Sequence, residues 1–279
     1  MPSPYRPRIG VTTSLDVNAR GAAEQRVELA YVRAVERAGG LPVLVPLLAT
    51  ASAADAFAEM LDGLVVTGGP AVTLGMRGER PADLADTPPE RSASDARLLG
   101  AFLDARRPCL GICYGMQLAS ALRGGTIWAD AERDRPDTAA HSSIRGGTEH
   151  GVRPVPGSRF ERIVGPAEIT VGTRHIQALD RVGDGLVVSA LAPDGVVEAL
   201  ETADGAFVGV QFHPEALSPP LDALFVDLVE RARAAREVPA DGAERRPESR
   251  AAVPAVRSLH DRAHESASAP GPLAAPRVS

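Results

Sequence analysis

One cysteine in the chain has the surroundings of a catalytic nucleophile. Cys113 stands between Gly111 and Gly115 in a G-x-C-x-G pattern, after an apolar run that predicts a strand and before a helical pattern. A sharp strand-to-helix turn exposes its central side chain, and the partial positive charge of the helix N-terminus favours a thiolate. The pattern therefore predicts a nucleophilic thiol. The simpler alternative is a buried structural cysteine in a glycine-rich turn.

A histidine and a carboxylate follow far downstream, in His213-Pro214-Glu215. Proline disfavours the helical conformation of the residue before it, so we expect His213 to be extended. Side chains two residues apart in an extended chain point the same way, which brings Glu215 beside the imidazole. A thiol, a histidine base and a carboxylate that orients the base form a nucleophilic triad. Alone, the segment is more typical of a strand exit; together with Cys113 it predicts such a triad.

Acyl transfer also needs two hydrogen-bond donors for the oxyanion. The backbone N–H after such a nucleophile is the usual first donor, and here it belongs to Tyr114. The Gly68-Gly69-Pro70 loop leaves the end of a neighbouring predicted strand, on the side where α/β sheets bind ligands. We therefore expect this loop to supply the second donor, although a turn of this composition is common.

A parallel α/β sheet would position these residues, and the first half of the chain has its pattern. Short runs of Val, Ile and Leu alternate with helical spacing of apolar residues. We predict strands at residues 8–13, 42–46, 63–67 and 108–112, and helices at residues 24–38, 53–60, 92–106 and 115–122. Residues 71–91 show no clear periodicity and predict a long functional loop.

After Trp128 the pattern changes, because residues 129–151 are polar and irregular. Strands are predicted around residues 168–171, 186–191, 196–201 and 206–212 without intervening helices, followed by a helix at residues 221–236. The second half therefore adds mixed or antiparallel strands. Residues 238–279 hold no aromatic residue and predict a disordered tail rich in Ala, Pro and Arg, since they cannot bury enough apolar surface. The predicted domain spans residues 1–237.

The composition of the 279 residues excludes several chemistries. All 30 basic residues are arginine, so the chain has no lysine for a Schiff base or a Walker phosphate loop. The arginines are scattered and are predicted to be solvated surface residues. A net charge of −6 argues against nucleic-acid binding. No run approaches the roughly 18 apolar residues of a membrane span, so we expect a cytoplasmic protein without membrane contact.

The other candidate ligands predict neither a metal nor another cofactor. Cys109 and Cys113 lie in one short segment where a mutual disulfide would distort the backbone, so we expect free thiols and a reducing compartment. Cys109 falls within the predicted strand as a small core residue. His141 and His150 flank a polar loop, but cysteines are absent nearby and carboxylates are sparse.

These motifs resemble the class I glutamine amidotransferase-like superfamily and, within it, the gamma-glutamyl-gamma-aminobutyrate hydrolase branch, peptidase family C26. The resemblance covers about residues 8–236. It rests on the Gly-Gly-Pro loop at 68–70, Gly-Ile-Cys-Tyr-Gly-Met-Gln at 111–117, the glycine pair at 124–125 and Val-Gln-Phe-His-Pro-Glu at 210–215. Pro-Asp-Gly-Val-Val-Glu-Ala at 193–199 and Thr-Arg-His-Ile-Gln at 173–177 resemble the hydrolase branch in particular.

The resemblance implies an α/β fold: a flavodoxin-like three-layer sandwich with a mainly parallel central sheet and added antiparallel strands. It implies that Cys113 is the nucleophile, that His213 is the acid/base and that Glu215 orients it. It also implies that Gly69 and Tyr114 are the oxyanion donors. It further implies that Gln117 holds the glutamyl group and that His175 and Gln177 line the substrate pocket.

Several positions depart from the branch. Tyr114 replaces a usual arginine, Gly172 begins a pair that is usually Asn-Ser, and Ile176 interrupts a usual His-His-Gln. Ala71 and Val72 stand where an acidic residue often follows the Gly-Gly loop. These changes bear on which amine is released and leave the predicted triad intact.

The resemblance implies a cysteine hydrolase that cleaves the γ-glutamyl amide bond of a γ-glutamylated amine, such as γ-glutamyl-GABA, through a γ-glutamyl thioester. The expected partner is this small-molecule substrate alone, and a homo-oligomer is compatible with the sequence. The alternative is a glutaminase subunit that delivers ammonia to a separate synthetase. A third class, a non-catalytic binding protein on this scaffold, is disfavoured by the intact Cys113, His213 and Glu215.

Overall fold

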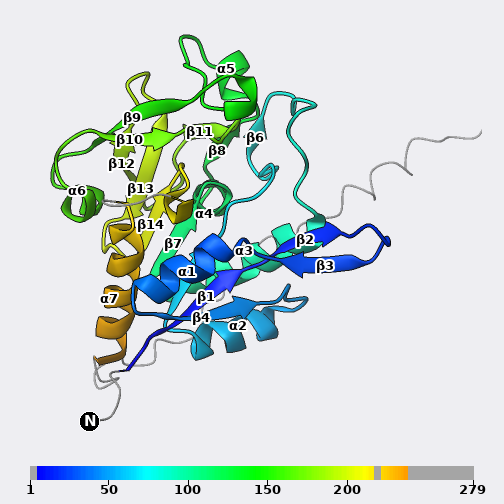
Figure 1. Cartoon of the computed structure of the whole chain (residues 1–279), viewed down its shortest axis with the longest axis vertical. Coiled ribbons are helices and arrows are strands. Elements are labelled where there is room, and N and C mark those ends of the chain that lie inside the picture. Colours follow the sequence, from blue (N-terminus) through cyan, green and yellow to red (C-terminus); the bar gives the residue numbers. More distant parts are fainter. Residues whose placement is uncertain (1–4, 217–220, 238–279) are drawn as a thin grey trace, which may run out of the picture. The chain divides into compact units, whose positions relative to one another are not determined.

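The computed structural model describes residues 5–216 and 221–237. Their centre is a nine-stranded sheet with the order β10-β9-β12-β13-β14-β7-β5-β1-β4 (Figure 1). Five neighbouring strands are parallel: β14 (Phe207–Val210), β7 (Cys109–Ile112), β5 (Gly63–Val66), β1 (Arg8–Thr12) and β4 (Leu41–Val45). Four antiparallel strands extend one side: β13 (Val197–Thr202), β12 (Leu186–Leu191), β9 (Glu149–Pro154) and β10 (Ile169–Gly172).

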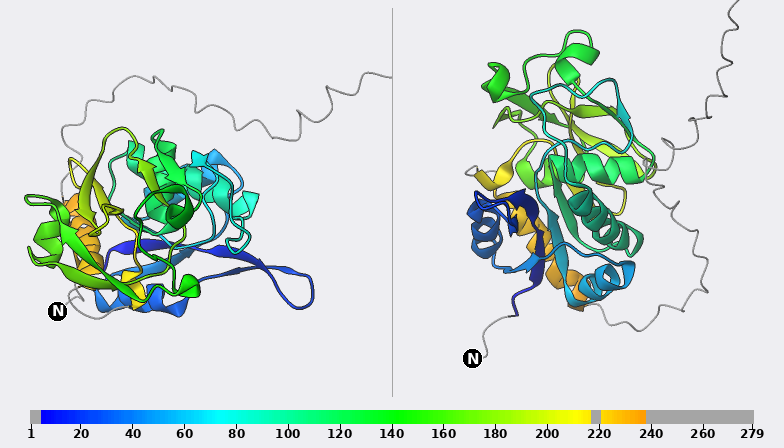
Figure 2. Two further views of the ribbon diagram at one scale, coloured as in Figure 1. Left: turned by 90° about the horizontal axis from the view of Figure 1, so that it is seen from above. Right: turned by 90° about the vertical axis from the view of Figure 1, so that its right-hand side faces the viewer.

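Helices cover both faces of the parallel strands because successive strand side chains point to opposite faces. In β5, Val65 belongs to one apolar cluster, and Leu64 and Val66 belong to another. On the first face α1 (Leu29–Arg37) packs beside α7 (Ala223–Glu237). The second face carries α2 (Ala51–Met60), α3 (Pro89–Asp104) and α4 (Tyr114–Leu122). The right-hand view of Figure 2 shows these helices on the two sides of the sheet.

The covering helices begin where the sequence supplies N-terminal signals. The Thr50 side chain accepts a hydrogen bond from the Ala53 N–H at the start of α2. Proline occupies the first position of α3, where its missing N–H costs nothing. Leu98, Leu99 and Phe102 then form the buried face of α3.

A smaller sheet and short helices connect these layers. Its strand order is β11 (Ala178–Arg181), β8 (Thr126–Trp128) and β6 (Met76–Arg77). It therefore joins the proline-containing segment at 71–91 to residues far downstream. The remaining helical elements are α5 (Ala131–Asp134), η1 (Ser143–Arg145), α6 (Arg159–Val164) and η2 (Pro214–Ala216).

The predicted helix at residues 24–38 is wrong over its first turn. Ala23–Arg26 form strand β3, which pairs antiparallel with β2 (Ser14–Val17). All four β3 residues are exposed, and the hairpin projects from the domain in the left-hand view of Figure 2. An exposed hairpin has no buried face, so its sequence shows no two-residue alternation of apolar and polar residues. Residues 24–26 therefore could not be distinguished from the helical pattern that follows them.

Other elements also differ from the sequence-based expectation. The predicted loop at 71–91 contains β6 and the first turn of α3, and α6 interrupts the strands of the second half. The last of those strands, β14, is parallel to β7 and so extends the central parallel sheet. The predicted disordered tail, residues 238–279, lies outside the described residues.

Candidate active site

Cys113 occupies a sharp turn between β7 and α4. Its backbone has φ 49° and ψ −100°, a conformation that non-glycine residues rarely adopt and that is typical of strained functional positions. Added Cβ atoms would collide here: one on Gly111 would lie 2.8 Å from the Gly115 carbonyl carbon, and one on Gly115 would meet the Val66 carbonyl oxygen. The two glycines therefore allow the close backbone approach that forms the turn.

His213 and Glu215 meet as predicted, but through a different local geometry. The His213 Nδ1 lies 2.7 Å from Glu215 Oε1. Strand β14 ends at Val210, and Glu215 lies in the 3₁₀ turn η2 rather than in an extended segment. Tyr31 completes this environment, because its hydroxyl lies 3.4 Å from His213 Nδ1 and accepts a hydrogen bond from the Gly68 N–H.

The imidazole of His213 is held in its charged form. Burial alone would lower the pKa of His213, but contacts with the Cys113 thiol and the Glu215 carboxylate outweigh burial and raise the pKa to about 10. Gln211 Nε2 also donates a hydrogen bond to Cys113 Sγ at 3.4 Å. The sulfur is therefore flanked by a cationic ring and an amide donor, which suits a nucleophilic thiol.

Gly69 and Tyr114 reach the same end of the sheet from neighbouring strands. Tyr114 begins α4, so its N–H has no acceptor within the helix. Gly69 follows β5, which pairs parallel with β7, and lines the same pocket as Cys113. A Cβ on Gly69 would lie 2.5 Å from Arg91 Nη1. A larger residue here would therefore displace either the loop or the Arg91 side chain.

The Arg91 side chain packs against the Gly68-Gly69 loop. The prediction that the arginines are solvated surface residues is therefore wrong at this position. Its side chain is 1% exposed and forms an ion pair with Asp95 Oδ2 at 3.2 Å. It donates to the Gly68 carbonyl oxygen at 2.8 Å and stacks on the Tyr114 ring at 4.7 Å. Burial raises the pKa of Asp95 to about 6 despite this pairing. The i, i+4 spacing of Arg91 and Asp95 is the sequence feature that indicates an ion pair between them.

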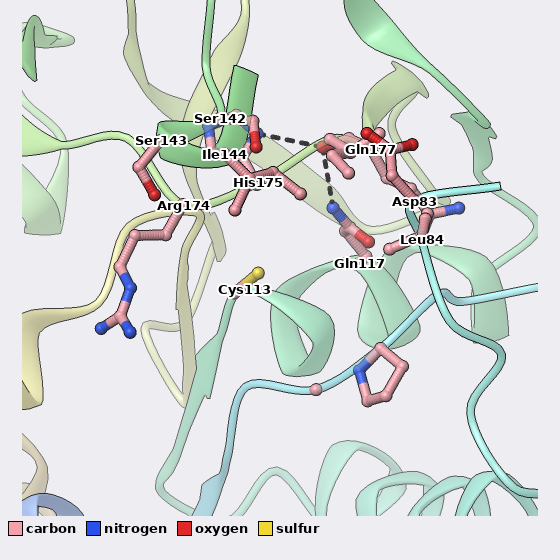
Figure 3. Close-up of a pocket in the computed structure, with 13 residues that line it drawn as sticks. Asp83, Leu84, Cys113, Gln117, Ser142, Ser143, Ile144, Arg174, His175 and Gln177 are labelled. Carbon is pink, nitrogen blue, oxygen red and sulfur yellow. Dashed lines mark hydrogen bonds between the residues drawn. The ribbon is translucent and has the colours of Figure 1, made fainter. Parts of the chain in front are cut away.

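A cavity of about 290 Å³ opens above Cys113. Its lining comes from the 69–84, 113–117, 142–144 and 174–177 segments. Figure 3 shows Arg174 on one side of Cys113, and Gln117 with Asp83 on the other. The Arg174 side chain is exposed, whereas Asp83 is paired with Arg145 Nη2 at 2.7 Å. The cavity thus offers a cationic group and a paired carboxylate around the thiol.

The three residues expected to contact substrate form one wall of this cavity. Gln117 Nε2 donates to the Gln177 carbonyl oxygen at 3.1 Å and to Gln211 Oε1 at 3.0 Å. The Gln177 side chain is used within the protein, since it donates to the Val72 carbonyl oxygen and accepts from the Val72 N–H. His175 Nδ1 lies 3.0 Å from the Gln177 carbonyl oxygen, and its ring is turned away from solvent.

Behind this wall the fold assembles a cluster that sequence reasoning missed. His141, His150, His175 and Glu198 present ligand-type atoms that all lie within 4.8 Å of one another. Burial, and then the charge of His175, lowers the pKa of His141. His141 and His150 were not predicted as metal ligands because their partners His175 and Glu198 lie far from them along the chain. The sequence feature that could have indicated the cluster is the presence of His175 and Glu198 in the two segments, 173–177 and 193–199, that resemble the hydrolase branch.

Cys109 is an inert core residue, as predicted. Both cysteines are free, and burial raises the pKa of the Cys109 thiol to about 12. Within the described ranges, no helix has the length and apolar character needed to cross a bilayer.

Comparison with known proteins shows which proteins this chain is similar to. The peptidase C26 family model matches residues 7–215. A Mycobacterium tuberculosis protein, provisionally named as a glutamine amidotransferase, is 35% identical over 220 residues, covering 75% of this chain and 70% of its own length. The gamma-glutamyl-gamma-aminobutyrate hydrolase PuuD of Escherichia coli K12 is 30% identical over 221 residues, covering 75% of this chain and 85% of that protein.

A solved structure is similar in fold. The glutaminase domain of Trypanosoma brucei CTPS with bound acivicin has a TM-score of 0.58 at 16% identity, covering 81% of this chain and 94% of that one. At this identity the likeness concerns the fold alone. It confirms the predicted flavodoxin-like sandwich with its mainly parallel centre and added antiparallel strands.

Proposed function

Because the chain belongs to the peptidase C26 family, we propose that it hydrolyses the γ-glutamyl amide bond of a γ-glutamylated amine and releases glutamate and the free amine. The observation that carries this proposal is the thiol of Cys113 on a strained turn at the base of the cavity. The His213 ring adjoins the thiol and is paired with Glu215 at 2.7 Å. This set of groups suits acyl transfer to sulfur.

In the first step the Cys113 thiolate, whose proton is held by His213, attacks the carbonyl carbon of the side-chain amide and a C–S bond forms. The carbonyl oxygen becomes an oxyanion, which accepts hydrogen bonds from the Gly69 and Tyr114 N–H groups. His213 then donates its proton to the amide nitrogen, so the C–N bond breaks and the neutral amine leaves. The products of this step are the amine and a γ-glutamyl thioester.

In the second step water attacks the thioester carbonyl. His213, now neutral, accepts a proton from the water as the C–O bond forms. The tetrahedral intermediate collapses, the C–S bond breaks and glutamate departs. Glu215 holds the imidazole orientation through both steps by its contact with Nδ1.

The charges around the cavity match the invariant part of such a substrate. A γ-glutamyl group carries an α-carboxylate, an α-ammonium and a γ-carbonyl. Arg174 supplies a guanidinium suited to the carboxylate, and Asp83 supplies a carboxylate suited to the ammonium. Gln117 lies at the cavity wall next to Cys113 and acts as a neutral hydrogen-bonding residue for the glutamyl chain.

A second candidate is a glutaminase subunit that passes ammonia to a separate synthetase. The likeness to a glutaminase domain supports this alternative, although it concerns the fold alone. Both activities would use the same thioester chemistry. They differ in the leaving amine and in whether the isolated chain is fully active.

The test is glutamate release by the isolated full chain from a panel of γ-glutamyl amines, with free glutamine in parallel. We expect γ-glutamyl amines to turn over faster than glutamine. Cys113→Ala should abolish release, while the matched Cys109→Ala variant should keep it, because Cys109 is buried within β7. Slow turnover of glutamine alone would favour the synthetase partner. Full activity in Cys113→Ala would refute the mechanism.

A further inference from the structure

Four side chains from separate segments converge behind the cavity wall. His141 precedes η1, His150 lies in β9, His175 lies between β10 and β11, and Glu198 lies in β13. His141, His175 and Glu198 are at most 4% exposed. Three histidines around one buried carboxylate form a donor set that the proposed thiol chemistry does not use.

Three of the six distances between ligand atoms in this histidine–glutamate cluster are close to those of tetrahedral coordination. Glu198 Oε1 lies 3.6 Å from His141 Nδ1, 3.1 Å from His150 Nε2 and 3.4 Å from His175 Nε2. A tetrahedral Zn²⁺ with bonds of about 2.0–2.1 Å holds its ligands about 3.3 Å apart. The three nitrogens therefore already lie near the tetrahedral edge length from the oxygen.

The same atoms lack hydrogen bonds. His141 Nδ1, His150 Nε2, His175 Nε2 and both Glu198 oxygens are buried without a hydrogen-bond partner in the described part of the chain. Glu198 Oε1 is within ion-pair distance of the three rings, but these contacts do not have hydrogen-bond geometry. Buried polar atoms that remain unpaired are costly, so their convergence on one point indicates a missing electrophilic partner.

The opposite ring nitrogens of two histidines are held by the pattern typical of metal ligands. His141 Nε2 contacts Asp194 Oδ2 at 2.8 Å, and Asp194 is itself fixed by the Ala139 and Val196 N–H groups. His175 Nδ1 contacts the Gln177 carbonyl oxygen at 3.0 Å. Metal-binding histidines usually donate their second N–H to a carboxylate or a carbonyl, which orients the ring.

We propose that His141, His150, His175 and Glu198 bind one Zn²⁺ ion as a closed, structural site. Three imidazoles and one carboxylate match the donor preference of zinc, whereas Ca²⁺ and Mg²⁺ prefer oxygen ligands. The four ligands fill a tetrahedron, so this zinc takes no part in the thiol chemistry. No ligand of this site belongs to the proposed triad, and its existence does not depend on the proposed hydrolase activity.

Zinc at this position joins the segments that form the cavity wall. It links the start of the 141–145 segment to the 173–177 segment, and both contribute to the cavity lining. The Gln177 carbonyl oxygen contacts His175 Nδ1 and also accepts a hydrogen bond from Gln117 Nε2, so these two side chains share one partner. The metal thereby fixes the shape of the pocket wall that faces the substrate.

The test measures zinc rather than activity, in the full chain without an affinity tag and in the Cys113→Ala background. This background removes the active-site thiol as a competing zinc ligand. After treatment with EDTA, dialysis and addition of Zn²⁺, elemental analysis should give about one zinc per chain. Substitution with Co²⁺ should give the intense visible bands of four-coordinate cobalt.

Two variants in this background locate the metal. His150→Ala removes a ligand, so bound zinc should fall to the level of a protein-free blank. Asp194→Asn removes only the charge that orients His141, and should weaken zinc affinity by about 10–100-fold while the ligands remain. Asp204→Asn is the matched control, because Asp204 also accepts a backbone N–H in a turn but contacts no ligand histidine. It should leave zinc affinity unchanged.

Each outcome decides the proposal. Stoichiometric zinc that is lost in His150→Ala and weakened in Asp194→Asn supports it. It is overturned if the folded Cys113→Ala chain retains no zinc, if His150→Ala retains it, or if Asp194→Asn and Asp204→Asn bind equally well. Weak bands of six-coordinate cobalt would also overturn the tetrahedral site. Circular dichroism of each variant shows whether the chain has folded.

Discussion

The guanidinium of Arg91 lies 4.7 Å from the centre of the Tyr114 ring. Tyr114 follows the proposed nucleophile, and Arg91 also donates to the Gly68 carbonyl oxygen at 2.8 Å. One buried cation thus contacts the side chain of one proposed oxyanion residue and the loop that carries the other. The positions of Tyr114 and of the Gly68-Gly69 loop relative to each other therefore depend on Arg91, which need not touch the substrate.

Arg91→Gln should destabilise the protein, because it leaves Asp95 buried without its charged partner. Breaking a buried ion pair costs about 3–5 kcal/mol. We expect the free energy of unfolding, measured in urea at neutral pH, to fall by this amount. The exposed Arg97→Gln on the same helix is the control, and the loss of its hydrogen bond to Leu48 should cost about 1 kcal/mol or less. Equal losses in the two variants would contradict the bracing role.

Gly69→Ala should lower kcat far more than it changes stability. The new Cβ would lie 2.5 Å from Arg91 Nη1. Because this buried guanidinium is fixed by Asp95 and the Gly68 carbonyl oxygen, we expect the loop to shift and carry its N–H away from the oxyanion position. Losing one oxyanion donor typically costs about 10²–10³-fold in kcat. Gly100→Ala on α3 has open space around its Cβ and should keep full activity. An unchanged kcat in Gly69→Ala would remove this residue from the proposed mechanism.

The residues of the candidate site were predictable from sequence where short motifs encode them. Cys113 with its two glycines, and His213 with Glu215, each occupy one turn of chain, so a few residues bring each set together, although the 3₁₀ turn at Glu215 was not predicted. The parallel strands were also predictable, because buried strands form continuous apolar runs. In contrast, β2 and β3 bury little apolar surface and left no periodic signal.

The histidine–glutamate cluster could not be predicted in the same way. Its four ligands are spread from residue 141 to residue 198, and β9, β11 and α6, which lie along this stretch, were not predicted. The burial of Arg91 has a similar origin, since the sequence does not indicate that the 68–69 loop covers it. Both features depend on the tertiary packing of long-range partners.

Stability should decrease as pH rises above neutrality, and His213 should contribute to this loss. The pKa of His213 in the folded state, about 10, lies above its ordinary value of 6.5. The folded state therefore binds more protons than the unfolded state between these values. The stability from this group is complete below pH 6.5 and is lost as pH approaches 10.

Urea unfolding of the wild type and His213→Gln across this pH range measures that contribution. The variant lacks the titrating ring, so its free energy of unfolding should fall less steeply with pH. Groups that titrate in alkali without contacting His213 are common to both proteins and cancel in the difference. Identical slopes would mean that His213 has an ordinary pKa in the folded protein.

Arg174→Ala should impair the binding of γ-glutamyl substrates through their α-carboxylate. A charge-assisted hydrogen bond contributes about 1.5–3 kcal/mol, so kcat/KM should fall by about 10–150-fold, mainly through KM. The decisive comparison uses a substrate analogue that lacks the α-carboxylate. Against this analogue the wild type and Arg174→Ala should have similar kcat/KM, because the carboxylate partner is absent. An equal loss on both substrates would show that Arg174 does not recognise this group, and would require another residue at the cavity to supply the charge.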